Sequence, residues 1–360
     1  MSVLQTHAAV RVQPFSGDKW CVRHITDRKE FVVSSLIAAM IVLLFKGENL
    51  LQIKSLINET HFINSKQFYA TIQLLLDSNI ILEANNKEQE NIKEIISKWN
   101  KFGWLEAADY HLATFDYPFI DDENNNYRRQ DNSKVQSYYL EAPDINRSKE
   151  FNNAITNISL LTPKEYLVDL NMKFKQIFTP QLNRRLDSKH IKMIASVTFG
   201  ALRTRNDRQS YRAETIRKTS PSGGLRHPTE GYFFLLQDIS DLQAGIYHFS
   251  ISKQSLELIN NLSDIIPKKV FPGVFRASFT PKVVIILTSI FEKNMYRYRE
   301  PRTLRTIFID TGHIAETIKL LCKGLNIHYF SHSYIEEDEV EKILKLRRLE
   351  EGVIYSVALS

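Results

Sequence analysis

Apolar positions over 1–29 form short β-type stretches between turn residues, whereas those over 31–84 predict three short helices and a strand. The apolar run over 31–45 is shorter than the ~20 residues that a membrane span needs, so it predicts a buried helix. A second helix is predicted over 50–57, and a third over 65–76, where apolar residues recur on one helical face. A short strand follows at 80–82. The order helix, helix, helix, strand is that of a winged helix.

The sequence of the remaining chain predicts a connector followed by a second globular region. Residues 91–116 continue in a helical pattern, and the Asn-rich polar stretch over 121–134 predicts a linker or a mobile loop. From 163 onward, helical and extended patterns mix. The predicted helices span 163–176, 187–199, 303–323 and 336–345, and the predicted strands span 231–237, 246–250, 282–289, 327–331 and 353–358. We therefore predict three parts, which are a winged-helix-like module (1–95), a helical connector with the Asn-rich loop (96–162) and a mixed domain (163–360).

Composition places the chain among ordinary globular proteins. Of its 360 residues, 43% are hydrophobic and 24% charged, which excludes wholesale disorder and collagen-like chains. Its two cysteines, Cys21 and Cys322, are far apart in the sequence, and no spacing typical of a zinc site occurs. We expect a cytoplasmic protein without a signal peptide, a membrane span or a metal.

Positive charge is concentrated in the middle of the chain. Residues 173–226 carry thirteen Lys and Arg against three Asp and Glu, a net of +10, whereas the whole chain carries +6. Such a region attracts a polyanion or a phosphorylated ligand, although a solvated basic face would look the same. The module over 30–94 is acidic instead, which disfavours nucleic-acid binding and leaves peptide docking or a structural role.

A small-residue motif lies inside the basic region, at Ser220–Pro221–Ser222–Gly223–Gly224. Two glycines beside a hydroxyl residue allow a flat ligand to approach the backbone closely, although a simple turn has the same composition. The motif is neither a P-loop nor a dinucleotide fingerprint, because no GK[ST] or GxGxxG accompanies it.

A second motif, Tyr296–Arg297–Tyr298–Arg299, places a tyrosine between two arginines. A neighbouring cation favours the phenolate form of a tyrosine, so Tyr298 is a candidate proton-transfer group. A basic surface stretch is the alternative interpretation.

Taken together and in order, these segments resemble a known family. Residues 199–250 include FGALRTR and SPSGGLRHPTEGYFFLLQDISDLQAGIYHF, and residues 291–331 read FEKNMYRYREPRTLRTIFIDTGHIAETIKLLCKGLNIHYFS. They are similar to the SagB-type dehydrogenases of the nitroreductase superfamily, and more narrowly to the peptide maturation dehydrogenases. That group has the pattern PSGG(A/G)xHPxE, then GLYHY, then (K/R)Y…R…DxGHxxQ. The resemblance covers 199–360 and extends less clearly over 75–116.

The resemblance implies an α+β, nitroreductase-like domain over 163–360 that binds FMN at a homodimer interface. Arg184 falls where the family has the last arginine of an RRTxRxF pattern that holds the flavin phosphate. Pro180 and Gln181 replace the two leading arginines. Arg203 and Arg205 are therefore further candidates for the phosphate. The turn formed by Ser220, Pro221, Ser222, Gly223 and Gly224 would lie against the isoalloxazine, with Ser222 at its polar edge, and His227 would face the substrate or fix the loop.

The resemblance also implies a chemistry, with one departure. Azoline-oxidising members use a Lys-Tyr pair, and here Tyr298 matches the tyrosine while Arg297 stands at the lysine position. Arginine stays protonated and cannot act as a base. We therefore expect Tyr298 to transfer the proton, with Arg297 tuning it and stabilising negative charge on the substrate.

Three functions remain open from the sequence. The first is an FMN-dependent dehydrogenase that oxidises azolines to azoles in a ribosomally made peptide, acting with a cyclodehydratase. The second is a flavin-dependent reductase of dehydroamino acids or of a small molecule. The third is a non-catalytic scaffold of a peptide-modification complex.

Overall fold

The computed structural model describes residues 3–45, 47, 49–60, 63–84, 86–117, 126–141, 148–174, 185–205, 215–263 and 265–360. The chain folds as two compact units, Met1–Phe119 and Ile120–Ser360. The connector expected over 96–162 is therefore divided between them.

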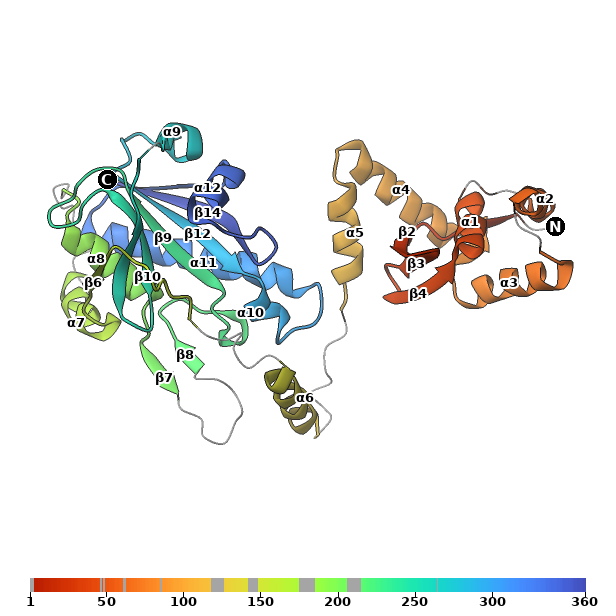
Figure 1. Cartoon of the computed structure of the whole chain (residues 1–360), viewed down its shortest axis with the longest axis horizontal. Helices are drawn as coiled ribbons and strands as arrows, with labels where there is room; N and C mark the ends of the chain where they lie inside the picture. Colours follow the sequence, from red (N-terminus) through yellow and green to blue (C-terminus); the bar gives the residue numbers. More distant parts are fainter. Residues whose placement is uncertain are drawn as a thin grey trace. The chain divides into compact units, whose positions relative to one another are not determined.

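The first unit combines short strands with helices, and Figure 1 shows β2, β3 and β4 beside α1. Its elements are β1 (Leu4–Thr6), β2 (Val10–Ser16), β3 (Lys19–His24), β4 (Lys29–Ser34), α1 (Ser35–Leu44), α2 (Leu50–Thr60), α3 (Ser65–Asp77), β5 (Ile81–Glu83), α4 (Lys87–Lys101) and α5 (Leu105–Thr114). Strands β2, β3 and β4 form an antiparallel meander, and β5 pairs with β1. The three helices and the following strand thus occur in the order that the sequence predicts.

Two expected helices have different boundaries from those predicted. The apolar run over 31–45 is not one helix, because its β-branched start pairs with β3, as Val32 does with Cys21, and Ser34 then caps α1. The helix expected over 91–116 is two helices, α4 and α5, separated at Gly103, whose φ of +74° is one that glycine adopts without strain.

The second unit is built on one seven-stranded sheet. Its elements are α6 (Tyr127–Glu141), β6 (Thr156–Ser159), α7 (Pro163–Phe174), α8 (Ser188–Phe199), β7 (Arg203–Arg205), β8 (Thr215–Arg217), η1 (Gly223–Leu225), β9 (Thr229–Leu235), β10 (Gly245–Ser250), β11 (Ser255–Asn260), α9 (Pro267–Val270), η2 (Val274–Arg276), β12 (Val283–Ile290), α10 (Glu292–Met295), α11 (Thr303–Leu325), β13 (Tyr329–His332), α12 (Glu337–Leu344) and β14 (Glu351–Leu359). The strand order is β13-β14-β12-β9-β10-β11-β6, and every neighbouring pair is antiparallel.

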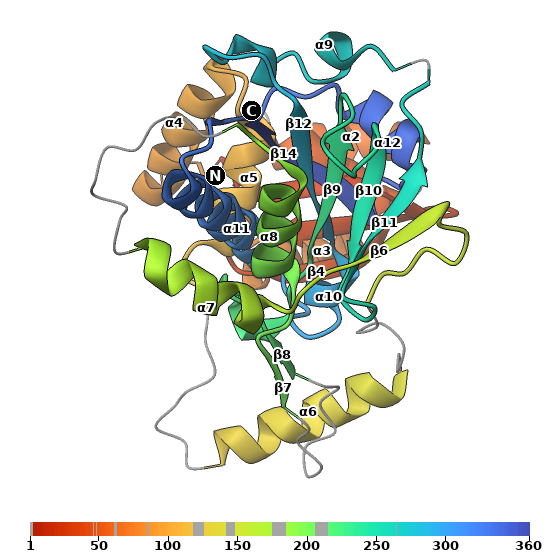
Figure 2. The same ribbon diagram turned by 90° about the vertical axis from the view of Figure 1, so that its left-hand side faces the viewer.

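Helices cover both faces of this sheet. Figure 2 shows α8 and α11 on the face toward the viewer, where Ile194, Phe233 and Ile318 belong to one buried cluster. On the opposite face, Phe234, Ile286 and Val340 belong to a second cluster, together with residues of α9 and α12. Strand β12 lies between the two clusters, which explains why its sequence is a continuous apolar run.

Part of the expected Asn-rich loop is helical. Residues 127–134 belong to α6, whereas 121–125 lie outside the described residues. The prediction of a loop was wrong for this part because α6 has almost no apolar periodicity, and its stability comes from the ionic and aromatic contacts described below.

Replacing Gly231 by Ala should destabilise the second unit, because a Cβ at this position would lie 2.3 Å from Cζ of Phe199. Overpacking of a core typically costs about 1–3 kcal/mol, which urea unfolding can measure. A Phe199→Leu change should recover part of the loss by making room, so the double variant should be more stable than the sum of the two single effects. Strictly additive effects would contradict this packing.

Candidate functional site

The small-residue motif forms a loop that a buried carboxylate of α11 holds in place. The Ser222 hydroxyl donates to Oδ2 of Asp310 at 2.6 Å, and the Gly223 amide donates to the same carboxylate at 3.1 and 3.2 Å. Ser222 Oγ also accepts from the His227 amide at 2.9 Å, and Ser220 shares a 2.6 Å hydrogen bond with Thr317. The loop is thus fixed to α11 by its own side chains, while Pro221 and Gly224 stay exposed.

The second motif meets the first at Gly224. This glycine has a φ of +61°, and a Cβ built on it would lie 1.9 Å from the Tyr298 hydroxyl oxygen. A Cβ on Gly223 would lie 2.3 Å from Cγ2 of Thr306. Only glycine allows the phenol group to approach the loop this closely. Two motifs that are far apart in the sequence therefore form one site.

Helix α6 binds the segment that carries Tyr298. Arg297 Nη2 donates to both carboxylate oxygens of Asp131 at 2.7 Å, and the Arg297 guanidinium lies 5.0 Å from the centre of the Tyr298 ring. Arg299 pairs with Glu141 and lies 3.7 Å from the centre of the Tyr138 ring. Arg297 is therefore directed by α6 and not free to rotate.

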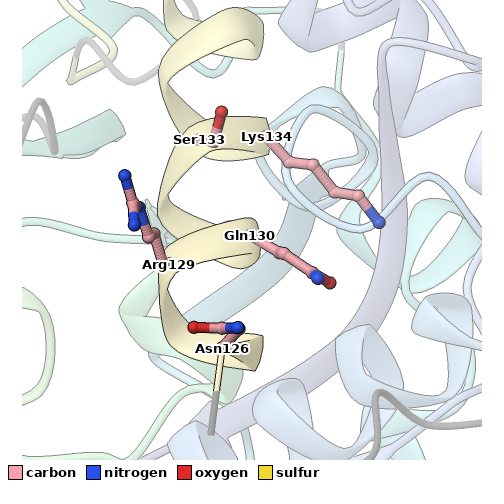
Figure 3. A pocket seen from close by; sticks show the side chains of 5 residues that line it. All are labelled: Asn126, Arg129, Gln130, Ser133 and Lys134. Atoms are coloured by element: carbon pink, nitrogen blue, oxygen red, sulfur yellow. The ribbon is translucent and has the colours of Figure 1, made fainter. Parts of the chain in front are cut away.

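The other face of α6 lines a shallow hollow of polar side chains, shown in Figure 3. The described lining residues are Asn126, Arg129, Gln130, Ser133 and Lys134. None of them takes part in the contacts with Arg297 and Arg299. This face therefore provides control positions that are separate from the ionic contacts.

Two basic groups beside the loop have altered pKa values. Burial lowers the pKa of His227 to about 3, with the nearby Lys218 charge acting in the same direction. Its ring is therefore neutral at pH 7, and Nε2 lies 2.9 Å from the Ile216 carbonyl, to which it donates as N–H. Burial also lowers the pKa of Lys218 to about 8, against the opposing effect of Glu230. Asp310 has a raised pKa because it is buried, although Ser222 and Gly223 oppose this shift.

Several buried polar atoms next to these motifs have no hydrogen-bond partner. They are Nε of Arg217, directly before Lys218, and both amide atoms of Asn294, one helical turn before Tyr298. Buried donors without partners are rare in folded proteins and often mark the place of a ligand. The set comprises one cationic donor, one amide donor and one amide acceptor, which suit contacts with a polar or anionic group.

The structure brings together some of the residues that the sequence predicts. Ser222, Gly223, Gly224, His227 and Tyr298 converge. Arg297 lies beside Tyr298 but is bound to α6. Arg184 lies outside the described residues. Arg203 and Arg205 form strand β7, which pairs with β8, and the structure describes only their backbone.

The site residues predicted from the sequence did not include Asp131, Lys218 or Glu230. The sequence also did not predict that Asp310 holds the loop. Glu230 and Asp310 are both letters of the family pattern, HPxE and DxGH, so the pattern itself was the available signal. No signal identified Asp131, because it lies in a stretch that had been interpreted as a loop.

Comparison with known proteins gives two sequence relatives. The chain is 28% identical over 260 residues to the trifolitoxin-processing protein TfxB of Rhizobium leguminosarum bv. trifolii, covering 67% of this chain and 66% of TfxB. It is 24% identical over 132 residues to MJ1384 of Methanocaldococcus jannaschii, which is named as a nitroreductase, covering 36% of this chain and 65% of MJ1384. The matched regions thus span just under two thirds of each relative. The resemblance to peptide-maturation proteins of the nitroreductase superfamily is confirmed.

The solved structures that the chain matches include a protein from Anabaena variabilis that is named as a nitroreductase. It is 20% identical, with a TM-score of 0.46, over 63% of this chain and 46% of that chain. The Escherichia coli microcin synthetase McbBCD complex, solved with truncated pro-MccB17, matches at 15% identity and a TM-score of 0.39, over 74% of this chain and 93% of that chain. Of the family models compared, none matches the chain.

Two expected absences can be compared with the described part of the chain. Among the described helices, none combines the length and the apolar character needed to cross a membrane. Among the described residues, no three potential metal ligands lie together.

Replacing Asp131 by Asn should loosen α6. The change keeps the shape of the side chain but removes a charge-assisted pair, which is worth about 1.5 kcal/mol or more. Amide hydrogen exchange over 127–141 should become roughly 10-fold faster on that basis. Ser133→Ala, on the opposite face of the same helix, is the matched control and should leave exchange unchanged. Equal exchange rates in the two variants would show that the ionic pair does not hold α6.

Replacing His227 by Asn should make the stability of the second unit less sensitive to acid. The pKa of His227 is about 3 in the folded state and 6.5 in the unfolded chain, so the unfolded state binds more protons between these values. The stabilisation is present above pH 6.5 and is lost as the pH falls. Between pH 7 and 5 the wild type should lose about 2 kcal/mol more than the variant, measured by urea unfolding.

Asparagine adopts positive φ values more readily than most residues. The φ of +46° at position 227 should therefore not itself destabilise the variant. The exposed His328, replaced in the same way, serves as the control. If both histidine variants changed the pH dependence equally, the burial of His227 would not be its cause.

Proposed function

We propose that the second unit is an FMN-dependent dehydrogenase of a ribosomally made peptide, which oxidises azoline rings to azoles. One observation carries the proposal, which is the placement of the Tyr298 hydroxyl against Gly224, the last residue of the small-residue loop. The similarity to TfxB, a protein named for trifolitoxin processing, supports a peptide as the substrate class. The similarity to MJ1384 supports redox chemistry.

The loop residues and the donors around them would hold the cofactor. Gly223 and Gly224 bring the loop backbone close to Thr306 and Tyr298, and Arg217 and Asn294 offer donors that have no protein partner. Arg184, Arg203 and Arg205 remain our candidates for the phosphate. When bound, FMN would supply the two-electron acceptor that the oxidation requires.

The protein's own residues would manage the proton. Aromatisation of an azoline ring removes one C–H hydrogen as a proton and another with the electron pair. Tyr298 would take the proton, because its hydroxyl lies at the loop and Arg297 cannot act as a base. Arg297, held by Asp131 at 2.7 Å, would stabilise negative charge that develops beside the ring of Tyr298.

We further propose a homodimer and a partner enzyme. Helix α11 exposes Phe308, Ile309 and Leu320, which supports association through this helix. A cyclodehydratase would supply the azoline, since this ring must be formed before it can be oxidised. The first unit, whose sequence predicts a winged-helix-like module, would dock the peptide.

Tyr298→Phe should keep the cofactor and lose turnover. The purified protein should show the absorption bands of oxidised flavin, and the variant should retain them, because only one oxygen atom is removed. Oxidation of a synthetic thiazoline peptide, followed by mass spectrometry as the loss of two hydrogens, should slow by about 100-fold or more.

Tyr296→Phe, which leaves the ring packed against Tyr138, is the matched control and should remain active. A colourless wild type that takes up no FMN would favour the scaffold alternative and overturn the proposal. Full turnover of Tyr298→Phe with native flavin content would remove Tyr298 from the chemistry.

A further inference from the structure

A groove lies between α9 and the start of α12, on the face of the sheet opposite α8 and α11. Its volume is about 640 Å³, and we call it the α9–α12 groove. The apolar part of its lining consists of Ile265, Val270, Pro272 and Ile343, together with Ile266. Ligand sites in proteins commonly have volumes of roughly 300–1,000 Å³. The groove is therefore large enough to take several side chains of a partner.

Backbone hydrogen bonds hold the two walls of the α9–α12 groove together. The Glu336 amide donates to the Val270 carbonyl at 3.0 Å, and the Gly273 amide donates to the Tyr334 carbonyl at 3.0 Å. Val270 is buried in the same apolar cluster as Val340 of α12, which fixes α9 against the sheet. The groove is thus preformed, so a ligand that binds there does not have to order its walls.

Part of the apolar lining remains accessible to solvent. Ile266, directly before α9, is 54% exposed, and Tyr334 is 47% exposed. The Arg276 guanidinium lies 5.5 Å from the centre of the Tyr334 ring, a cation–π distance that favours one orientation of the ring. Exposed apolar surface that is gathered in one place often marks an interaction site. The groove therefore suits a partner that brings apolar side chains.

The α9 wall of the groove is cationic. Lys268 and Lys269 both line the groove and are exposed, and no described acidic side chain pairs with either of them. On the α12 wall, Glu339 pairs with Lys342 at 3.0 Å, so its charge is compensated within the helix. Among the described residues, Glu336 is the one lining acid without an ion pair. The uncompensated charge of the described lining is therefore positive, with two lysines against one glutamate.

The α9–α12 groove is remote from the candidate site. The small-residue loop precedes β9, whereas the segment that contains α9 leads into β12, whose first residue, Val283, lies opposite Leu235 at the end of β9. Figures 1 and 2 both show α9 at the end of the second unit away from β7 and β8. The seven residues of β9 span roughly 20 Å. A peptide would need about six extended residues or more to reach from the groove to the loop.

We propose that the α9–α12 groove is an exosite for an acidic segment of the peptide substrate. Assigning this segment to the substrate rests on the proposed function. In an extended segment that alternates apolar and acidic residues, the two kinds of side chain point to opposite sides. The apolar side chains enter the groove, the carboxylates meet Lys268 and Lys269 at its rim, and Glu336 accepts from a main-chain N–H. Binding there raises the local concentration of the ring at the candidate site.

Fluorescence anisotropy with the full-length protein tests the exosite without any turnover. The probe is a short fluorescein-labelled peptide in which Asp and Leu alternate, and the same peptide with Asn in place of Asp should bind about 10-fold more weakly. Changing Lys268→Glu together with Lys269→Glu should weaken binding of the Asp peptide by about 10-fold or more, whereas arginine at both positions should preserve it. Ile266→Asn, at an exposed position, should weaken binding through the apolar contacts.

Lys164→Glu together with Lys189→Glu is the matched control. These lysines are exposed on α7 and α8, and the pair of changes alters the net charge by the same amount. The control should keep the wild-type affinity, and an equal loss in both double variants would reduce the effect to general charge attraction and overturn the exosite. Equal binding of the Asp and Asn peptides by the wild type would overturn it as well. So would sedimentation showing a dimer that the changes at Lys268 and Lys269 abolish, because a second copy would then occupy the groove.

Kinetics separate the exosite from the proposed function. A thiazoline peptide joined to the Asp–Leu segment through a flexible linker of about ten Gly and Ser residues should have a KM roughly 10-fold lower than the same peptide without the segment, with an unchanged kcat. The double change at Lys268 and Lys269 should abolish this difference and leave turnover of the short peptide unaltered. An inactive, flavin-free protein that binds the probe in the groove would overturn the proposed function and leave the acidic-peptide site in place. An active flavoprotein whose KM ignores the segment would overturn the exosite alone.

Discussion

The candidate site depends on the close approach of the Tyr298 hydroxyl to Gly224. At a separation that leaves no room for a Cβ, the phenol group and the loop backbone act as a single surface. Asp310 makes this possible, because its carboxylate accepts hydrogen bonds from both Ser222 and Gly223 and fixes the loop to α11. These hydrogen bonds and the close approach of Tyr298 connect three parts, which are α11, the small-residue loop and the segment after α10. A change in any one of these three would alter the other two.

The two faces of the large sheet differ in chemistry. The face under α8 and α11 is apolar, and so is most of the opposite face. Near the start of β9, however, the opposite face carries Glu230, which contacts Lys293 and His248, and a second network formed by Lys149, Tyr232, Thr288 and Glu351. Buried charge is therefore concentrated at the end of the sheet where the loop and Tyr298 lie. This clustering is what one expects of a site that must hold or move protons.

Much of the second unit could be predicted from the sequence, because its helices and strands have clear periodicity. Strand β12 is a continuous apolar run, and α11 alternates buried and exposed positions over its whole length. Strand β11 was missed because its central Glu257 suggests an exposed position, whereas the residue is fully buried by pairing with His248 and Lys253. Helix α6 was missed because its stability comes from Asp131 and Glu141, whose partners lie more than 150 residues away. The phosphate candidates Arg184, Arg203 and Arg205 stay predictions.

Helix α6 also changes where the second unit of the chain must be taken to begin. The mixed domain expected from 163 onward would lack α6 and the segment containing Lys149. A fragment cut at that position would leave Arg297 and Arg299 without their carboxylates and would leave Glu351 buried without its ammonium partner. Any independently folding excerpt of this region must therefore start upstream of Tyr127, because α6 belongs to the second unit and is not a spacer.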